Sequence, residues 1–417
     1  MNNYDVIIIG AGAAGLAAGK VCAQASCSTL IIDRSDRTGG VLDQCIHNGF
    51  GVRYFKEELT GPEFAHRLSI RAKKAGADFA LSATVTGIKK LPDGTFHIRA
   101  LSKNEGVTVY HARAVMLAAG CRERTRGALA IPGGRPAGIF TAGAAQKLLN
   151  RSGFLPGKSA VIVGSGDIGL IMARRLRWCG IEVKAVIEIM PYTAGLTRNV
   201  VQCLHDFNIP LYLSTSVVKI SGTDRVCGIT AAPLDRQRQP DMTKAFDIKC
   251  DTVLFSVGLI PEMELAGKLG VKENPATGGA VIDSTYSTSV PGVFSAGNML
   301  HVHDLADFAA EEAEYAAKCM IDYLVGVRTA AEFQVKAGKN LKYAIPNRIS
   351  PSAIDSLRFL FRPTVVTDRA VLKAKVNGVT VWNKKLLYVR PAEMISAELK
   401  NCNVSGDIIF ELEETEK

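Results

Sequence analysis

The sequence has no closely spaced pair of cysteines. Its ten cysteines are scattered over 417 residues, and the two nearest to each other, Cys22 and Cys27, are five positions apart. Zinc, iron–sulfur and redox-dithiol sites commonly use a Cys-x-x-Cys spacing, so the pattern disfavours all three and we predict no metal site. Cysteines scattered in this way are typical of a reducing compartment, which predicts a cytoplasmic location.

Long apolar runs are also missing. No stretch approaches the ~18 consecutive apolar residues of a membrane-spanning helix, so we predict no membrane span. Residues 6–18 are apolar, but Asp5 stands where a secretory signal has basic residues, and glycines interrupt the stretch at a motif spacing. We therefore interpret this segment as part of the fold. With 47% apolar and 22% charged residues, the composition predicts a globular chain of two or three domains.

Positive charge is concentrated near the C-terminus. The net charge is +10, and residues 331–400 alone contain 13 basic and 5 acidic residues, followed by an acidic segment at 407–416. A basic surface can attract an acidic partner or can simply keep a protein soluble, and both interpretations remain open. The chain has no aromatic stacking motif for bases, so nucleic-acid binding is not expected.

A dinucleotide-binding motif stands at the N-terminus. The Ile-rich run Tyr4–Ile9 predicts a buried parallel strand, followed at once by three glycines in a Gly-x-Gly-x-x-Gly pattern and by a helix of small residues. A second strand, 29–32, ends at an acid. The glycines provide a tight turn, close approach of a pyrophosphate and helix packing, and the acid accepts hydrogen bonds from a ribose. The predicted site residues are Gly10, Gly12, Ala14, Gly15, Asp33 and Arg34.

The same unit is repeated 154 residues later, where strand 159–163 precedes a second Gly-x-Gly-x-x-Gly pattern and strand 183–187 ends at Glu188. Two such sites predict one tightly bound redox cofactor and one exchangeable nicotinamide. Glu188 would repel a 2′-phosphate and accept a hydrogen bond from a 2′-hydroxyl, which favours NADH over NADPH. The predicted site residues are Gly164, Gly166, Asp167, Gly169 and Glu188.

These features, in this order, resemble the two-dinucleotide flavoproteins related to the disulfide reductases, from Tyr4 to about Leu324. Besides the two motifs, the resemblance rests on Gly39-Gly40, Thr84-Val85, residues 118–120, 256–258 and 291–298. It implies FAD at the first site and NAD at the second, with Asn298 contacting the ribityl chain where the family usually has an aspartate. The additional cofactor-binding residues that it implies are Gly40, Val85, Ala119, Gly120, Gly258, Gly297 and Asn298.

A closer resemblance is carried by Ile131-Pro132-Gly133 and by residues 135–146, 45–51 and 301–304. These segments are similar to the NADH- and FAD-binding subunits of multi-component dehydrogenases, the group around opine oxidase, hydrogen cyanide synthase and the sarcosine oxidase alpha chain. They look most similar to the flavoprotein that accompanies a glycerol-3-phosphate dehydrogenase-like subunit. The resemblance implies electron exchange with a partner flavoprotein subunit, and it leaves a homo-oligomer open.

The chain departs from the disulfide reductases at one important place. Those enzymes carry two cysteines four residues apart soon after the Gly-Gly pair, whereas residues 41–47 contain only Cys45. Reduction of a disulfide through a resident dithiol is therefore disfavoured. Cys45 stands where single-cysteine NADH oxidases and peroxidases place a reactive thiol, so redox chemistry and simple space-filling are both open.

Histidines supply the remaining candidate catalytic groups. His47 can donate a proton to flavin or substrate, or it can be a packed, hydrogen-bonded side chain. His301 and His303 share one face of an extended segment, which also suits a metal. We favour groups that face the flavin or contact the substrate, then a structural role, and a metal site least. Asp304 is predicted to cap a helix that begins near Leu305. The predicted catalytic residues are Cys45, His47 and His303.

The predicted fold class is α/β, with two Rossmann-like dinucleotide-binding domains and a small β-rich C-terminal appendage. The FAD domain is predicted in two pieces, 1–125 and 260–327, around an NAD domain at 126–259. Residues 328–417 form the appendage, with a hairpin at 371–382 around Asn377-Gly378 and further strands at 386–390 and 408–412. It is interpreted either as a docking module or as a lid that stabilises the FAD domain.

The leading functional hypothesis is an FAD flavoprotein that transfers a hydride between NADH and flavin and exchanges electrons with a partner dehydrogenase subunit of the glycerol-3-phosphate or amino acid/opine type. One alternative is a stand-alone NADH oxidase, peroxidase or polysulfide reductase that uses Cys45. Another is a non-catalytic nucleotide-bound protein that docks through its basic region.

Overall fold

A computed structural model describes residues 2–327, 332–349, 356–400 and 405–415. The chain divides into two compact units, the first made of residues 1–121 and 261–417 and the second of residues 122–260. The chain passes between them at β9 (Cys121–Glu123) and β18 (Leu259–Pro261), which pair with each other. The α/β class with two Rossmann-like sheets and a β-rich C-terminal region is confirmed. In the described part of the chain, no helix is long and apolar enough to cross a membrane.

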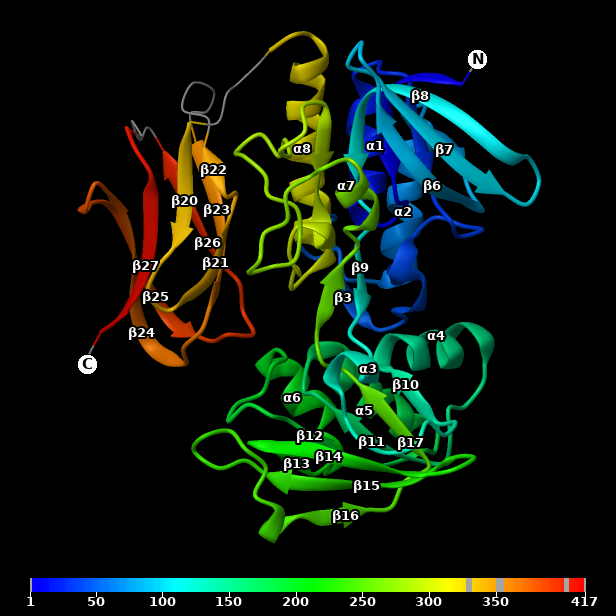
Figure 1. Ribbon diagram of the computed structural model, residues 1–417, viewed down its shortest axis with the longest axis vertical. Coiled ribbons are helices and arrows are strands. Elements are labelled where there is room, and N and C mark those ends of the chain that lie inside the picture. Colours follow the sequence, from blue (N-terminus) through cyan, green and yellow to red (C-terminus); the bar gives the residue numbers. More distant parts are fainter. Residues whose placement is uncertain (1, 328–331, 350–355, 401–404, 416–417) are drawn as a thin grey trace. The chain divides into compact units, whose positions relative to one another are not determined.

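The first unit is built on a seven-stranded sheet (Figure 1). Its strand order is β5-β2-β1-β8-β7-β6, and β19 also pairs with β8. Strands β1, β2, β5, β8 and β19 run parallel, while β6 and β7 extend the sheet as an antiparallel hairpin. The bounds are β1 Asn3–Ile9, β2 Thr29–Ile32, β5 Asp78–Ala80, β6 Ala83–Lys90, β7 Phe96–Ser102, β8 Gly106–Leu117 and β19 Val293–Ser295.

Small residues allow two helices of this unit, α1 (Ala13–Gln24) and α8 (Ala306–Leu324), to pack side by side (Figure 1). In α8 the buried stripe is mainly alanine, and in α1 a Cβ on Gly19 would lie 2.4 Å from Ile31 of β2. α2 (Gly61–Lys74) begins with a capping box between Thr60 and Glu63. The shorter elements are η1 Gly40–Gln44, β3 Asn48–Phe50, β4 Leu59–Thr60, α7 Glu264–Lys268 and η4 Gly297–Met299.

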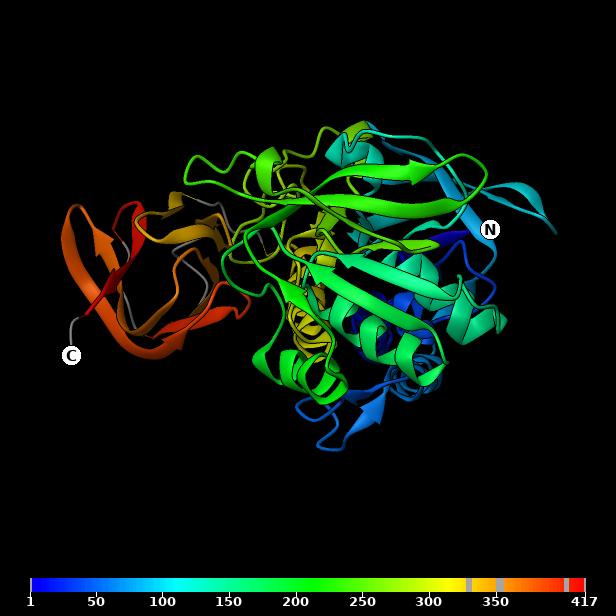
Figure 2. The same cartoon turned by 90° about the horizontal axis from the view of Figure 1, so that it is seen from below.

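The second unit has three layers, as the view from below shows (Figure 2). A parallel sheet of order β10-β17-β11-β12-β13 has helices on one face and an antiparallel sheet, β14-β15-β16, on the other. Alternation along β11 explains the layers, because Ala160 and Ile162 pack with the helices while Val161 and Val163 pack with β14 and β15. The strands are β10 Ile139–Thr141, β11 Ser159–Val163, β12 Glu182–Ile187, β13 Leu211–Tyr212, β14 Thr215–Gly222, β15 Val226–Pro233, β16 Phe246–Ile248 and β17 Thr252–Phe255. The helices are α3 Arg126–Leu129, α4 Ala142–Ser152, α5 Asp167–Trp178, α6 Thr197–Cys203, η2 His205–Phe207 and η3 Met242–Lys244.

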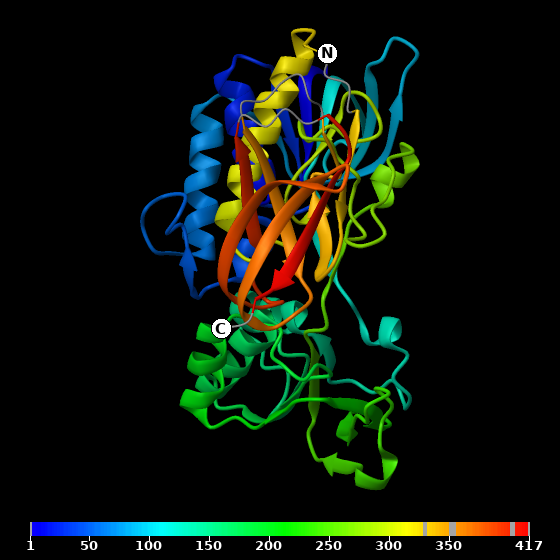
Figure 3. The same ribbon diagram turned by 90° about the vertical axis from the view of Figure 1, so that its left-hand side faces the viewer.

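The C-terminal region of the first unit forms two sheets (Figure 3). The outer sheet has the strand order β22-β20-β27-β24-β25, and the inner sheet has the order β21-β23-β26. Their inward side chains form a separate apolar cluster, but Tyr343, Ile345 and Leu360 belong to the main core of the unit. The bounds are β20 Phe333–Ala337, β21 Leu341–Ile345, β22 Arg348–Ile349, β23 Ser356–Pro363, β24 Thr367–Val376, β25 Val379–Val389, β26 Ile395–Lys400 and β27 Ile408–Glu414.

The predicted hairpin is present, and Asn377 and Gly378 turn it with φ of +51° and +81°, as a type I′ turn requires. The strand predicted at 386–390 is present up to Val389, but it is not separate from the hairpin, because β25 runs without a break from Val379 to Val389. The intervening Asn383, Lys384 and Lys385 are exposed strand residues and do not form a turn.

The excess positive charge of the C-terminal region is partly neutralised by acidic residues that lie beside it in the structure. Of the acidic segment predicted at 407–416, Glu411, Glu413 and Glu414 lie on β27, next to β24, and Glu416 lies outside the described residues. Glu411 pairs with Lys375, and Glu413 pairs with Lys373. Asp407 also pairs with Lys336. Much of the local positive charge is therefore neutralised, which weakens the interpretation of this region as a basic docking surface.

Candidate dinucleotide sites

Three loops meet at the carboxyl edge of the first sheet. Strands β1, β8 and β19 end together, because Ile9 pairs with Leu117 and Leu117 pairs with Ser295. The loops 10–12, 118–120 and 296–298 therefore share the edge at which open α/β sheets bind their ligands. The contact between the first and third loops is close, since a Cβ on Gly297 would lie 2.8 Å from the Cβ of Ala14.

The glycines of the first motif have distinct steric roles. Gly10 has φ +111°, and a Cβ there would lie 2.3 Å from the carbonyl oxygen of Ala118. A Cβ on Gly15 would lie 1.8 Å from the carbonyl oxygen of Gly10, so α1 packs directly on the turn. By contrast, apart from its neighbours in the chain, no described atom lies within 4 Å of a Cβ on Gly12. Helix α1 begins at this open space without a side-chain cap, so its first N–H groups are available to an anion.

The other predicted FAD residues are distributed around this point. Gly40 approaches Gly12, since a Cβ on Gly40 would lie 3.3 Å from the Cα of Gly12. Ala119 is exposed, and Gly120 has φ +70°. Arg34 is exposed, and the segment that contains Val85 begins beside Asp33, where Ala83 N donates to the Asp33 carbonyl oxygen at 3.0 Å.

Each of the two predicted ribose-binding acids braces its own glycine loop. Asp33 accepts hydrogen bonds from the backbone N–H of Ala11 at 2.7 Å and of Ser35 at 2.8 Å. Glu188 accepts from the N–H of Ser165 at 2.8 Å, from the Ser165 hydroxyl at 2.6 Å and from the N–H of Met190 at 2.9 Å. Ala11 and Ser165 occupy the same position between the first two glycines of their motifs, so the sequence repeat is also a repeat of hydrogen bonding. Sequence reasoning found the acids and missed Ser165.

The second motif is built against Ser256, the first residue of the turn 256–258, in which the sequence had assigned only Gly258 to the site. A Cβ on Gly164, which has φ +93°, would lie 2.1 Å from the Ser256 carbonyl oxygen, and Gly169 N donates to Ser256 Oγ at 3.0 Å. Helix α5 begins at Gly166 without a side-chain cap. Gly258, two residues beyond Ser256, is exposed with φ +98°.

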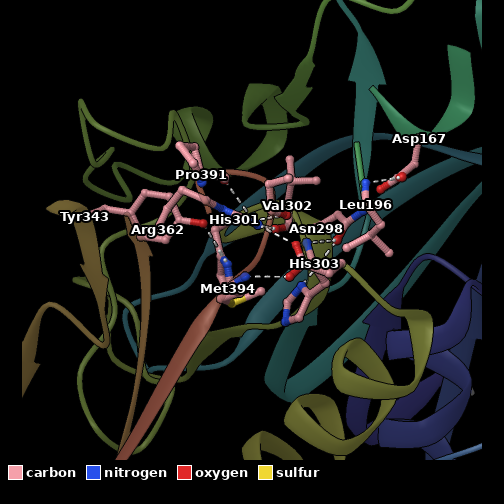
Figure 4. A network of polar contacts seen from close by, with 12 residues as sticks. Asp167, Leu196, Asn298, His301, Val302, His303, Tyr343, Arg362, Pro391 and Met394 are labelled. Atoms are coloured by element: carbon pink, nitrogen blue, oxygen red, sulfur yellow. Dashed lines mark hydrogen bonds and ion pairs between the residues drawn. The ribbon is translucent and has the colours of Figure 1, made fainter. Parts of the chain in front are cut away.

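Two charged groups near this motif have partners that the sequence did not predict. Asp167 accepts hydrogen bonds from Leu196 N at 2.8 Å and Asn199 Nδ2 at 2.7 Å, so its carboxylate braces the loop before α6 (Figure 4). Arg238, an exposed residue, lies with Nη2 3.1 Å from Sδ of Met190, two positions after Glu188.

Cys45 and His47 lie on the loop between η1 and β3. The Cys45 thiol is buried and lies 3.3 Å from the carbonyl oxygen of Val41. Burial raises the pKa of this thiol to about 12, so it is protonated at neutral pH. His47 Nδ1 lies 3.0 Å from the carbonyl oxygen of Asn48, and its ring packs against Phe50.

Asp307 anchors the following loop and was not anticipated. This buried residue in the first turn of α8 accepts hydrogen bonds from the backbone N–H of Gly51, Arg53 and Tyr54 at 2.9–3.0 Å. The contact joins residues more than 250 positions apart in the chain, so no local pattern could have revealed it.

His303 lies in a buried polar cluster beside the FAD edge (Figure 4). Its Nε2 is 3.2 Å from Glu312 Oε2, and His301 Nε2 is 3.4 Å from the same oxygen. Burial alone would raise the pKa of Glu312, but the His303 charge and the hydrogen bonds of both rings lower it below its usual range. Burial lowers the pKa of His301 to about 4. These donors are of types that zinc accepts, and the prediction of no metal stays a prediction.

The sequence predicted that Asp304 caps α8, and this prediction is wrong. The residue before that helix is Leu305, which makes no side-chain cap, and the Asp304 carboxylate turns to the C-terminal strands instead. It accepts from Arg362 Nη2 at 2.7 Å and from Met394 N at 2.6 Å (Figure 4). Arg362 also donates to the carbonyl oxygens of Val302 and Ala392 at 3.0 and 2.8 Å. Hydrogen bonds and an ion pair from the C-terminal region therefore fix the loop that follows Asn298.

The residues at the first edge fit FAD. The open space at Gly12, the uncapped N-terminus of α1 and the adjoining loops provide a cradle for a pyrophosphate and its attached groups. The second motif repeats the uncapped helix and the braced glycine loop, which suits a nicotinamide dinucleotide.

A sequence profile of the family described as pyridine nucleotide-disulphide oxidoreductase matches residues 4–313, and the chain belongs to this family. Its members bind FAD and NAD(P)H, and the class is that of FAD-dependent NAD(P)H oxidoreductases. The predicted cofactors and enzyme class are thus confirmed.

The relatives include subunits of multi-component enzymes and thioredoxin reductases. Hydrogen cyanide synthase subunit HcnB of Pseudomonas protegens is 27% identical over 327 residues, covering 71% of this chain and 66% of the relative. An opine oxidase subunit of Rhizobium meliloti is 24% identical over 414 residues, covering 91% of this chain and 72% of the relative. The crystal structure of T. acidophilum thioredoxin reductase matches with 26% identity and a TM-score of 0.65, covering 78% of this chain and 100% of that one. The chain spans about two thirds of the length of HcnB.

Proposed function

We propose that this chain is the NADH- and FAD-binding subunit of a multi-component dehydrogenase and exchanges electrons with a partner subunit. The observation that carries the proposal is the extent of the two kinds of match. The match to thioredoxin reductase covers all of the reductase but only 78% of this chain. The match to the opine oxidase subunit covers 91% of this chain and therefore reaches into the C-terminal strands. The part of the chain beyond the reductase fold therefore has its counterpart in a protein whose name says that it is a subunit.

The cysteines support this proposal over disulfide reduction. None of the nine described cysteines forms a disulfide, and no two cysteines in the sequence have the Cys-x-x-Cys spacing of a redox dithiol. The high pKa of Cys45 also argues against the alternative of a thiol-based oxidase, peroxidase or polysulfide reductase, because the reactive form in such chemistry is the thiolate. Electrons that reach the flavin then need an acceptor outside this chain.

Bound FAD supplies a two-electron centre that can accept a hydride from a nicotinamide. The chain's own residues bind and orient the two nucleotides: the uncapped starts of α1 and α5 hold the phosphates, and Asp33 and Glu188 fix the glycine loops. Glu188 adds negative charge where a 2′-phosphate would bind, which supports NADH over NADPH. The Arg238 side chain beside Met190 brings positive charge near the same position and acts in the opposite direction.

The first experiment is an anaerobic titration of the purified chain with NADH and with NADPH, following the flavin absorption band. We expect rapid bleaching by NADH and slow or incomplete bleaching by NADPH. Arg238→Ala is the matched variant: it should leave NADH unaffected, and any residual NADPH reduction should fall. A flavin that neither nucleotide bleaches, or one that prefers NADPH in both proteins, would contradict the cofactor assignment.

The partner is tested separately. The reduced chain is offered a small disulfide, thioredoxin and oxygen, and then a co-expressed dehydrogenase subunit from the same source. We expect turnover with oxygen and disulfides to be slow, and to rise at least tenfold with the correct subunit. Fast steady-state reduction of disulfides by the isolated chain would overturn the proposal and favour the reductase function of its structural neighbours.

A further inference from the structure

The outer sheet of the C-terminal region is covered at one end and open at the other. At the covered end, β22 has two residues, and the backbone N–H of Arg348 donates to the carbonyl oxygen of Ile282 at 3.3 Å. At the other end, β25 has eleven residues, and β24 is its one neighbour in the sheet within the described part of the chain. The outer edge of β25 therefore presents backbone N–H and C=O groups that no described strand pairs, and such an edge is a template for a further strand.

Apolar side chains are exposed near both ends of β25. Val379 and Val381 near its start are 65% and 49% exposed, and Leu387 and Tyr388 near its end are 67% and 68% exposed. Trp382, on the opposite face of the strand, packs against the apolar cluster between the two sheets. The exposed residues have no such cover, and their burial by a partner would favour association.

The middle of β25 is positively charged. Lys384 and Lys385 lie at its centre, and the strand contains no acidic residue. Lys384 Nζ donates to the carbonyl oxygen of Ser396 on β26 at 3.0 Å, so this side chain reaches from the outer sheet to the inner one. The paired acids of β27 contact lysines of β24 instead, and no described acid forms an ion pair with Lys385. The centre of the strand therefore keeps its positive charge.

This charge discriminates between possible occupants of the edge. A second copy of β25, paired antiparallel about the centre of the strand, would place lysine opposite lysine, and like charges in opposite positions destabilise a sheet. An extended segment with acidic residues in its middle would place opposite charges there, and apolar residues on either side would cover the exposed ends. The edge therefore disfavours self-association and favours an acidic strand from a different protein.

We propose that the open edge of β25 binds the partner subunit: an extended segment of that subunit pairs with β25 as an additional strand, with acidic side chains opposite Lys384 and Lys385 and apolar side chains over the two exposed ends. Backbone pairing supplies affinity, and the alternating side chains supply specificity. The inference rests on the proposed function, which requires a partner. Its location is consistent, because β25 lies beyond residue 313, where the match to the oxidoreductase family ends, in the region that the longer match to the opine oxidase subunit reaches.

Hydrogen exchange of the FAD-loaded full chain, measured by mass spectrometry, tests the strand pairing. The probe is a synthetic peptide of eleven residues, the length of β25, with alternating valine and threonine and two glutamates at its centre. We expect the amides of residues 379–389 to exchange several-fold more slowly with the peptide present, because the outward N–H groups gain partners, whereas the amides of β22 should not change. No protection of β25 at high peptide concentration would overturn the proposal. A dimer of the chain in which β25 is protected without peptide would also overturn it, because a second copy would then occupy the edge.

Charge reversal tests the selectivity, with binding measured by the fluorescence anisotropy of labelled peptides. The wild type should bind the glutamate peptide at least roughly tenfold more tightly than the same peptide with two central lysines. In the double variant Lys384→Glu/Lys385→Glu this order should reverse, while Lys342→Glu, at an exposed position on β21, is the matched control and should bind as the wild type does. Lys385→Glu alone leaves the contact of Lys384 with Ser396 in place, and it should reduce the preference even if the double variant does not fold. Equal affinity of the wild type for the two peptides would refute the charge complementarity.

A competition experiment distinguishes failure of this inference from failure of the proposed function. The co-expressed dehydrogenase subunit is added to the complex with labelled peptide, and electron transfer to the subunit is measured in the same samples. We expect the subunit to displace the peptide. A subunit that accepts electrons, leaves the peptide bound and is insensitive to the charge reversal would overturn docking at β25 while the proposed function stands. A subunit that displaces the peptide without raising turnover would support docking at β25 and count against the proposed function.

Discussion

Acidification should destabilise the first unit through His301. This fully buried ring has its pKa lowered to about 4, mainly by burial, whereas an unfolded chain gives histidine its ordinary value of about 6.5. As the pH falls below 6.5, the unfolded chain takes up a proton that the folded chain refuses. The stability that depends on neutral His301 is therefore complete above pH 6.5 and is lost progressively between pH 6.5 and 4.

The size of the effect follows from the two pKa values. Between pH 7.5 and 5.0, the difference between the two pKa values lowers the free energy of unfolding by about 2 kcal/mol, which is equivalent to about 1.5 pKa units. His301→Gln removes the titration while keeping a donor for Glu312 and an acceptor for Tyr343. The wild type should therefore lose about 2 kcal/mol more than this variant over the same pH interval.

The assay is urea unfolding at pH 7.5 and 5.0, with saturating FAD, followed by far-ultraviolet circular dichroism. His66→Gln, at an exposed position, is the control and should show the same pH dependence as the wild type. Equal losses in the wild type and His301→Gln would refute the reasoning, because they would mean that His301 binds its proton equally well in both states.

Three further predictions concern other parts of the first unit. Gly12→Ala should weaken FAD binding but change the stability of the apoprotein by no more than about 1 kcal/mol, because the added Cβ enters open space, whereas Gly15→Ala should also destabilise the fold by about 1–3 kcal/mol through its clash with Gly10. Thermal unfolding and FAD titration distinguish the two variants, and equal apoprotein stabilities would contradict the assignment. Cys45→Ser should retain at least half of the NADH-dependent flavin reduction rate in stopped-flow experiments, and a loss of tenfold or more would restore the thiol hypothesis. Arg362→Ala should lower the free energy of unfolding by roughly 3 kcal/mol, because it leaves the Asp304 carboxylate without its charged partner, while Arg369→Ala, at an exposed position on β24, should change it little. Similar urea midpoints for the two variants would show that Arg362 does not stabilise the loop after Asn298.

Local sequence patterns predicted the two nucleotide-binding units well. Each needs a strand, three glycines, a helix and an acid within 30 residues, as in residues 4–33 and 159–188. These requirements are steric, as the contacts of Gly10 and Gly15 with the neighbouring backbone illustrate. The Asn-Gly turn of the C-terminal hairpin was predictable for the same reason, since both residues adopt positive φ.

The partners of the candidate site were not predictable, because they come from distant parts of the chain. Asp304 was a reasonable helix cap from its position before α8, but Arg362, 58 residues later, offers it a charged and partly buried partner. Asp307 and Ser256 likewise act on loops about 255 and 90 residues away. The net charge of residues 331–400 misled for a related reason, because the neutralising acids lie on a strand that is adjacent in space.

We expect the two C-terminal sheets to be under different evolutionary constraints. Tyr343 and Arg362 lie on β21 and β23 of the inner sheet, and they contact His301 and Val302 in the loop after Asn298. The outer sheet ends in β25, on which Val379, Val381, Leu387 and Tyr388 are 49–68% exposed and make no comparable contact among the described residues. Sequence drift should therefore be slow on the inner sheet and fast on the outer one, so that lineages can retune what this face meets without disturbing the redox centre.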